Sequence, residues 1–330
     1  MSYALSRQVG GKLPGSGCTR ITVSCTPADS ARSTTCTLPS MLNVLAQSLN
    51  DLGNSCENRG KRRSARLLYR SAAILRPHWS SPWYNLGLQA KYLCDWSASL
   101  QFNERAATLD PNDEASWWNL GIAATALKDW PRARRAWKSC GIELEDGSDE
   151  VLMPPVTACV RLDPNNSGEV VWGTRIDPAR IEILNVPLPN SNRRFRDIIL
   201  NDGAVEGTRK SGEREYPVFD ELAIWKRSNY STFQSAVALE NADAERQLIN
   251  MCNQNDIGIE NWSSVRVICA ACSRGSPEQH HCSANEIQQA EKNYGFAATS
   301  REFLIQVLSS WAQTGTGREF SDPHLVLLAS

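Results

Sequence analysis

Apolar positions between residues 46 and 147 follow a helical spacing, and the pattern repeats every 34 residues. Trp-Tyr-Asn-Leu-Gly at 83–87 aligns with Trp-Trp-Asn-Leu-Gly at 117–121, and Leu52 and Gly53 occupy the last two positions one period earlier. A second small-residue position is shared by Ala72, Ala106 and Cys140. Helices pack closely where one offers a small residue and the other inserts a large apolar side chain. The spacing therefore predicts three helical hairpins, over residues 46–79, 80–113 and 114–147.

This repeat resembles the tetratricopeptide repeat (TPR) family, over about 100 of the 330 residues. The resemblance implies an α-solenoid over residues 41–147, in which the first helix of each hairpin lines a concave groove that holds another polypeptide. Helical geometry assigns to this groove Asn50, Asn54, Asn58, Tyr84, Leu88, Lys91, Trp118 and Ile122. We expect Tyr84, Lys91 and Trp118 to contact a bound peptide. Because Lys91 is the one obvious cation of the set, capture of a chaperone's terminal carboxylate is disfavoured.

The pattern changes after residue 147, where Pro, Asn and Gly become frequent. Residues 148–192 are expected to form a linker and edge segment, and short alternating runs with turn signals predict a β-meander over 193–228. Over residues 230–330 the order is βαββαβ, which is typical of a ferredoxin-like unit. Its expected strands are 232–239, 264–271, 293–299 and 324–329, and its expected helices are 242–255 and 301–313. The predicted fold class is thus an α-solenoid followed by an α+β domain over 193–330.

Three sequence runs in the C-terminal half carry a second resemblance. They are Val-Val-Trp-Gly-Thr-Arg-Ile-Asp-Pro-Ala-Arg at 170–180, Asn-Val-Pro-Leu-Pro at 185–189 and Pro-Val-Phe-Asp-Glu-Leu at 217–222. Most of residues 155–275 is similar to an uncharacterised domain that follows the helical array in bacterial TPR-containing proteins. The resemblance implies an architecture and a bacterial source, and it implies no chemistry.

Composition narrows the classes of partner. The formal net charge is −1, and no apolar run approaches the roughly 18 residues that span a bilayer, so neither a nucleic acid nor a membrane is expected as a partner. Residues 1–40 contain thirteen Ser or Thr and one acidic residue, which predicts a disordered leader, with an organelle transit peptide as the alternative. The eleven cysteines are scattered through a large chain, which favours reduced thiols and a cytoplasmic location.

One window has metal-ligand spacing. Cys269 and Cys272 are separated by two residues, and His280, His281 and Cys282 follow within ten residues. Two such thiolates can share a tetrahedral zinc ion, with His281 and Cys282 completing the site. A redox-active dithiol and ordinary reduced cysteines remain open as alternatives. The corresponding function would be that of a zinc-dependent enzyme or sensor.

Searches for catalytic motifs give nothing: the chain has no phosphate-binding loop, no H-E-x-x-H and no G-x-S-x-G. An acidic group at Glu213, Glu215, Asp220 and Glu221 is interpreted as solvated strand ends, and His324 as a surface residue. We assign no catalytic residue and no certain cofactor. The sequence predicts a non-enzymatic adaptor that binds an unidentified protein or peptide.

Overall fold

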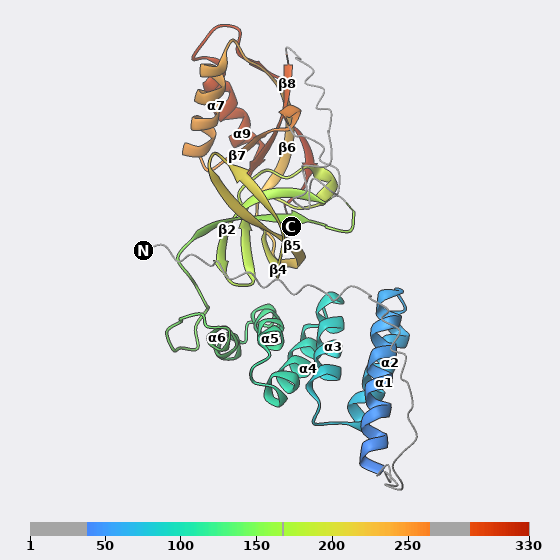
Figure 1. Cartoon of the computed structure of the whole chain (residues 1–330). Coiled ribbons are helices and arrows are strands. Elements are labelled where there is room, and N and C mark those ends of the chain that lie inside the picture. The colour runs from blue at the N-terminus through green and yellow to red at the C-terminus, as the bar shows by residue number, and fades with distance from the viewer. Residues whose placement is uncertain (1–37, 167, 265–290, 330) are drawn as a thin grey trace.

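The computed structural model describes residues 38–166, 168–264 and 291–329. Helices come first along the chain and strands dominate afterwards, which gives an α+β class molecule (Figure 1). The helices of the N-terminal part are α1 (Leu38–Asn58), α2 (Arg62–Leu75), α3 (Ser80–Tyr92), α4 (Trp96–Leu109), α5 (Glu114–Ala126) and α6 (Trp130–Ser139). They form one antiparallel hairpin in each of the three 34-residue periods.

The repeated glycines explain why the helices of each hairpin approach closely. A Cβ at Gly53 would lie 2.5 Å from the Tyr69 ring, and one at Gly121 would lie 2.5 Å from the Trp137 ring. Only glycine leaves room for such large side chains at the contact. The turns between the two helices also correspond, because Cys94 and Lys128 both have positive φ angles, of 55° and 60°. The close packing within each hairpin thus follows from side-chain sizes that recur with the sequence period.

A closed barrel follows the helices. Its strands are β1 (Val156–Leu162), β2 (Glu169–Asp177), β3 (Arg180–Ile183), β4 (Ile198–Ser211) and β5 (Arg214–Lys226). Successive strands are antiparallel and β5 closes on β1 in parallel, as an odd number of alternating strands requires. Residues 148–192, expected as a linker and edge segment, therefore contribute β1 to β3. Their proline and glycine residues lie between and beside short strands, and single-sequence patterns do not separate that case from a linker.

The last part of the chain is a second sheet with two helices. Its elements are β6 (Ser231–Ala238), α7 (Ala242–Gln254), β7 (Gly258–Asn261), β8 (Glu291–Ala298), α9 (Arg301–Ala312), β9 (Glu319–Phe320) and β10 (His324–Leu327). The strand order is β10-β6-β8-β7 with antiparallel neighbours, and β9 pairs with β6. Strand β7 at 258–261 was not predicted, and the expected strand at 264–271 lies, from residue 265 on, outside the described residues.

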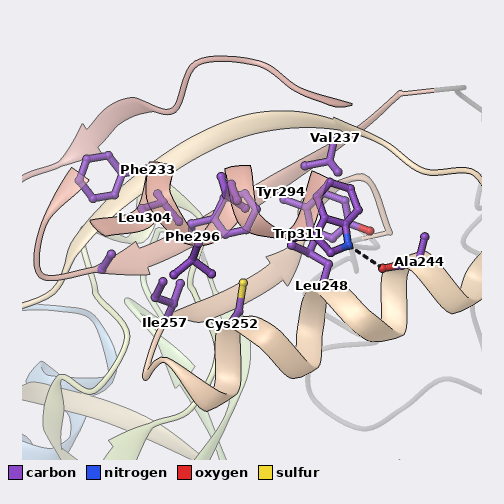
Figure 2. Close-up of a cluster of buried hydrophobic side chains, with 13 residues drawn as sticks. Phe233, Val237, Ala244, Leu248, Cys252, Ile257, Tyr294, Phe296, Leu304 and Trp311 are labelled. Atoms are coloured by element: carbon purple, nitrogen blue, oxygen red, sulfur yellow. Dashed lines mark hydrogen bonds between the residues drawn. The ribbon is translucent and has the colours of Figure 1, made fainter. Parts of the chain in front are cut away.

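The core of this unit lies between the sheet and its helices (Figure 2). Trp311 of α9 is fully buried, and its indole N–H donates to the Ala244 carbonyl of α7 at 3.1 Å. Leu248 of α7 and Phe296 of β8 are also fully buried. No helix in the described part of the chain is long and apolar enough to cross a membrane.

Candidate functional site

The helical array meets the barrel through a bulge in β4. Asn201 pairs with Glu221 and Val205 pairs with Phe219, so three residues of β4, numbers 202–204, oppose one residue of β5. Bulges bend a strand and redirect its side chains. This one projects toward α3 and α5, beside which the barrel lies in Figure 1.

Asp202 from the bulge binds the array directly. Its carboxylate accepts a hydrogen bond from Lys91 Nζ at 2.8 Å and another from Tyr92 Oη at 3.0 Å. Lys91 Nζ also donates to Asn119 Oδ1 at 3.0 Å, and its side chain is only 4% exposed. Burial and the Asp202 charge raise the pKa of the Tyr92 hydroxyl. The cation predicted to face a partner peptide is therefore already paired with a carboxylate of the same chain.

Gly203 brings the bulge into contact with Trp118. A Cβ at Gly203 would lie 1.8 Å from the Trp118 indole nitrogen, so the glycine backbone packs directly on the ring. Trp118 also packs edge-on against Trp137, with ring centroids 5.2 Å apart. The Trp118 N–H is buried without a hydrogen-bond partner. Two residues predicted to bind a peptide, Lys91 and Trp118, are thus covered by the barrel.

An apolar cluster continues this contact behind Trp118. Ile122 and Trp137 from the third hairpin, Val151 from the connection, and Ala179 and Leu200 from the barrel form one buried group. Predicted groove residue Ile122 is fully buried in it. Because the cluster joins both parts of the molecule in a single core, the third hairpin and the barrel are held together by apolar burial.

Arg180 completes the junction. Its guanidinium is fully buried, bonds Asp177 at 2.6 Å and the Val151 carbonyl at 2.9 Å, and pairs with Glu150. It lies over the indoles of Trp130 and Trp225, 5.0 and 4.4 Å from the ring centroids, and such cation–π contacts strengthen when desolvated. We call the contacts of the β4 bulge, the apolar cluster and Arg180 the array–barrel junction.

Hydrogen bonds between side chains link the helices of the first two hairpins. Asn85 Nδ2 donates to Asn50 Oδ1 at 3.0 Å and to Asn54 Oδ1 at 3.3 Å, and Tyr69 Oη donates to Asn54 Oδ1 at 2.9 Å. Gln89 donates to the Glu57 carboxylate. Asn54 and Asn58 are exposed, whereas Asn50 is buried under its amide neighbours. These amide-bearing residues form a polar surface across α1 and α3, which we call the amide face.

Tyr84 and Leu88 lie between the amide face and the junction, and both are half-buried. Burial is the main cause of the raised pKa of the Tyr84 hydroxyl, with further contributions from the Asp113 and Asp202 charges. Asn119 hydrogen-bonds this hydroxyl and opposes the shift. Of the eight predicted groove residues, Lys91, Trp118 and Ile122 belong to the junction, and the other five remain on the open side or at its border.

The sequence analysis did not identify four residues that contribute to the amide face or to the array–barrel junction. Asn85 and Asn119 share one repeat position, next to the predicted Tyr84 and Trp118, and Tyr92 follows Lys91. The 34-residue period could have identified the two asparagines, because both are polar at a position facing the neighbouring hairpin. Asp202 carries no such signal, since its role depends on how the barrel docks.

The predicted zinc ligands Cys269, Cys272, His281 and Cys282 lie outside the described residues, so the zinc site stays a prediction. No cluster of metal-ligand side chains occurs in residues 38–166, 168–264 and 291–329. The cysteines of those ranges, Cys56, Cys94, Cys140, Cys159 and Cys252, are free thiols.

The acidic group on β5 divides into two parts. Glu213 and Glu215 are exposed, as expected. Asp220 and Glu221 instead form ion pairs with Arg161 and Arg193, each at 2.6 Å. Glu221 is buried and Asp220 is half-buried, so their ion pairs contribute to the barrel structure and only Asp220 keeps contact with solvent. His324 is exposed at the start of β10.

Comparison with known proteins gives weak structural similarities. No protein-family model matches the chain, and no curated protein is significantly similar to it. The second TPR domain of Spaghetti (RPAP3), solved with the HSP90 peptide SRMEEVD, is 18% identical over 30% of this chain and 93% of its own, with a TM-score of 0.29. The Arabidopsis OM64 TPR domain is 16% identical over 30% and 82%, with a TM-score of 0.28. A hypothetical protein from Neisseria gonorrhoeae is 13% identical over 54% and 98%, with a TM-score of 0.24. Similarity at this level assigns no activity or ligand to the chain.

Proposed function

We propose that the chain is a non-enzymatic adaptor that binds another polypeptide on the amide face of the first two hairpins. The observation that supports this proposal is the amide face, on which Asn54 and Asn58 are exposed and Asn85 is half-buried and donates a hydrogen bond to Asn54. The barrel closes the far end of the same surface through the array–barrel junction. A partner would therefore lie over the first two hairpins and stop at the β4 bulge.

Side-chain chemistry supports an extended peptide as the ligand. A carboxamide both donates and accepts hydrogen bonds, so a row of amides can pair with the alternating N–H and C=O groups of an extended backbone. Tyr84 and Leu88, at the border of the face, add apolar contact area. Because Lys91 is already neutralised by Asp202, it does not favour a strongly acidic partner.

Site-specific crosslinking tests the proposal. A photoreactive amino acid replaces Leu88 in one variant and Gln101, exposed on α4, in the control. We expect a partner from the native host to crosslink to position 88 and not to position 101. Once the partner is identified, replacing Asn54 and Leu88 together by Ala should weaken its binding by about tenfold or more, a loss of about 1.4 kcal/mol. Equal crosslinking at both positions, or unchanged affinity, contradicts the proposal.

The second sheet supports a finer assignment of the fold. We infer that residues 231–327 form a ferredoxin-like unit. If β6, β7, β8 and β10 are numbered one to four along the chain, they lie side by side in the sheet in the order 4-1-3-2, and neighbours are antiparallel. One helix follows the first of these strands and another follows the third. An experimental structure that includes the connection between β7 and β8 tests this. The unit gives no separate activity in this proposal.

A further inference from the structure

The charges of the helical array are divided between its two sets of helices. The first helices of the hairpins, α1, α3 and α5, carry three acidic residues and one cation, Lys91, which is paired with Asp202. The second helices, α2, α4 and α6, carry nine cations and one acidic residue. Basic charge in the array therefore lies almost entirely on the second helices.

The cations of α6 have partners in the same chain. Arg132 and Arg135 pair with Glu104 of α4, and Lys138 pairs with a carboxylate of the connection that follows α6. Arg134 donates to three backbone carbonyls of that connection. The basic charge of this helix is thus used within the array.

The cations of α2 have fewer partners. The 37 residues that follow Glu57 contain no acidic residue, and Glu57 itself lies 3.8 Å from Arg62. Three arginines of α2 form no ion pair within the described residues: Arg63, Arg66 and Arg70. The turn before α2 adds two exposed cations, Arg59 and Lys61. The basic charge of this hairpin is therefore available to a partner.

Exposed apolar side chains alternate with these arginines on one side of α2. Four exposed residues make up what we call the α2 stripe: Arg63, Leu67, Arg70 and Ile74. They are spaced by four, three and four residues, so they fall within about 60° of one another around the helix. Leu67 is 66% exposed and Ile74 is 77% exposed. The other side of α2 packs against α1 and α3 at one end of the array (Figure 1).

We propose that the α2 stripe binds the surface of a membrane that contains anionic lipids. The arginines would pair with lipid phosphate groups, and the apolar side chains between them would enter the headgroup region. No membrane partner was expected from the sequence because no segment could span a bilayer, but a helix that lies on a bilayer needs only an exposed stripe of this kind.

The composition and shape of the stripe favour a bilayer over other anionic partners. A nucleic acid backbone would pair with the arginines and would leave Leu67 and Ile74 in water. Peptides bind best in grooves or along sheet edges, whereas the stripe runs along the exposed side of a single helix. A bilayer is deformable and offers both phosphate groups and an apolar layer, so it matches both kinds of side chain.

Membrane binding would leave the proposed partner site accessible. Tyr69 of α2 donates a hydrogen bond to Asn54 of the amide face at 2.9 Å. Tyr69 lies about 130° around α2 from the centre of the stripe. The stripe and the amide face are therefore different surfaces, and either proposal can fail without the other.

Flotation of the full-length chain with lipid vesicles tests the inference. The wild type should float with phosphatidylcholine vesicles that contain about one third phosphatidylglycerol, and it should not float with pure phosphatidylcholine. Raising the NaCl concentration from about 50 to about 500 mM should release most of the protein, because salt screens the attraction between exposed charges.

A matched pair of charge variants locates the contact. Arg63→Glu with Arg70→Glu should weaken vesicle binding by about 25-fold or more, because each cation near an anionic surface contributes about fivefold. The control, Arg214→Glu with Lys226→Glu, makes the same change of charge at exposed positions of the barrel and should leave binding unchanged.

A second matched pair tests the apolar part of the contact. Leu67→Ser with Ile74→Ser keeps every charge and should weaken vesicle binding by about tenfold or more, because two apolar side chains no longer enter the headgroup region. The control, Leu152→Ser with Leu328→Ser, changes leucines that are 68% and 66% exposed and should leave binding unchanged. Circular dichroism verifies that each variant is folded.

Several results would overturn the proposal. A wild type that does not float with anionic vesicles does so, and so do equal effects of a stripe variant and its control. Unchanged binding of the Leu67→Ser with Ile74→Ser variant also overturns it, since the apolar residues distinguish a bilayer from other polyanions. Tighter binding to duplex DNA or to polyglutamate than to anionic vesicles identifies another class of partner and overturns it as well.

Discussion

The two ends of the helical array carry closely related repeats and have opposite environments. At the third hairpin, Trp118 and Ile122 contact the barrel and belong to the apolar cluster that joins the two parts. At the first hairpin, Leu52 is half-exposed and Asn54 faces solvent. The repeat alone does not decide whether a concave surface is available to a partner, because the domain that follows can occupy it. The third hairpin is held by the barrel, and our proposal assigns partner binding to the first two hairpins.

The largest expected loss of stability comes from replacing Arg180, which belongs to the array–barrel junction. Arg180→Ala leaves Asp177 buried without its ion pair and removes a cation from between two indoles, so we expect a loss of about 3–5 kcal/mol of unfolding free energy. Urea denaturation measures this. Arg214→Ala, at an exposed position on β5, serves as the control and should cost less than about 0.5 kcal/mol. Similar losses for both variants would contradict the role of Arg180 in the junction.

A matched pair of leucines compares the ends directly. Leu86→Ala creates a cavity at a 2% exposed site and should cost about 2–5 kcal/mol, whereas Leu52→Ala at a 51% exposed site should cost less than about 1 kcal/mol. Both residues occupy the same repeat position, so the comparison isolates the missing neighbour. Thermal unfolding at low protein concentration measures the two values. Equal losses would mean that the first hairpin is covered.

The ion pair between Lys91 and Asp202 is expected to contribute less. Asp202→Asn retains an acceptor for Tyr92 and removes the charge that faces buried Lys91, so a loss of about 2 kcal/mol is expected. Lys91→Met combined with Asp202→Asn should be less destabilising than the sum of the two single changes. A double-mutant cycle in urea denaturation gives the coupling energy. Strict additivity would show that the bulge does not recognise Lys91.

The smallest expected change in unfolding free energy is its dependence on pH, which arises in the barrel and not in the helical array. Burial raises the pKa of the Glu169 carboxyl to about 7 from its ordinary 4.5. The native state thus holds this proton more tightly than the unfolded chain, so the stabilisation is complete below pH 4.5 and is lost as pH rises through about 7. We expect about 1–2 kcal/mol less stability at pH 8 than near pH 5.

Glu169→Gln should remove most of that pH dependence, because the amide oxygen can still accept from the Leu188 N–H. Amide hydrogen exchange shows which elements lose protection when the pH is raised. When the barrel is loosened at high pH, the backbone amides of α5 at the junction should exchange faster after correction for intrinsic rates. The exchange rates of the α1 amides should not change. A pH response of equal size in α1 would show that the two ends are not independent.

The helical half was predictable because its information is local and repeated. Gly53 and Gly121 match large side chains in the partner helix at a constant offset, so side-chain size alone indicates each hairpin. The barrel was harder to predict from the sequence. Its strands β1 to β3 are short and separated by Pro, Asn and Gly residues, and closure requires β5 to pair with β1 from the far end of the unit. Such a long-range pairing leaves no periodic signal in one sequence.

The sequence by itself determined the 34-residue hairpin repeat and the α+β class, because each depends on spacing along one chain segment, and it proposed a set of side chains for partner binding. Only the tertiary structure decided which of those side chains are available. Lys91 and Trp118 are covered because a bulge in β4 brings Asp202 and Gly203 onto them from more than 80 residues away. Docking of this kind depends on the shape of two assembled surfaces, which the residue pattern of neither segment contains.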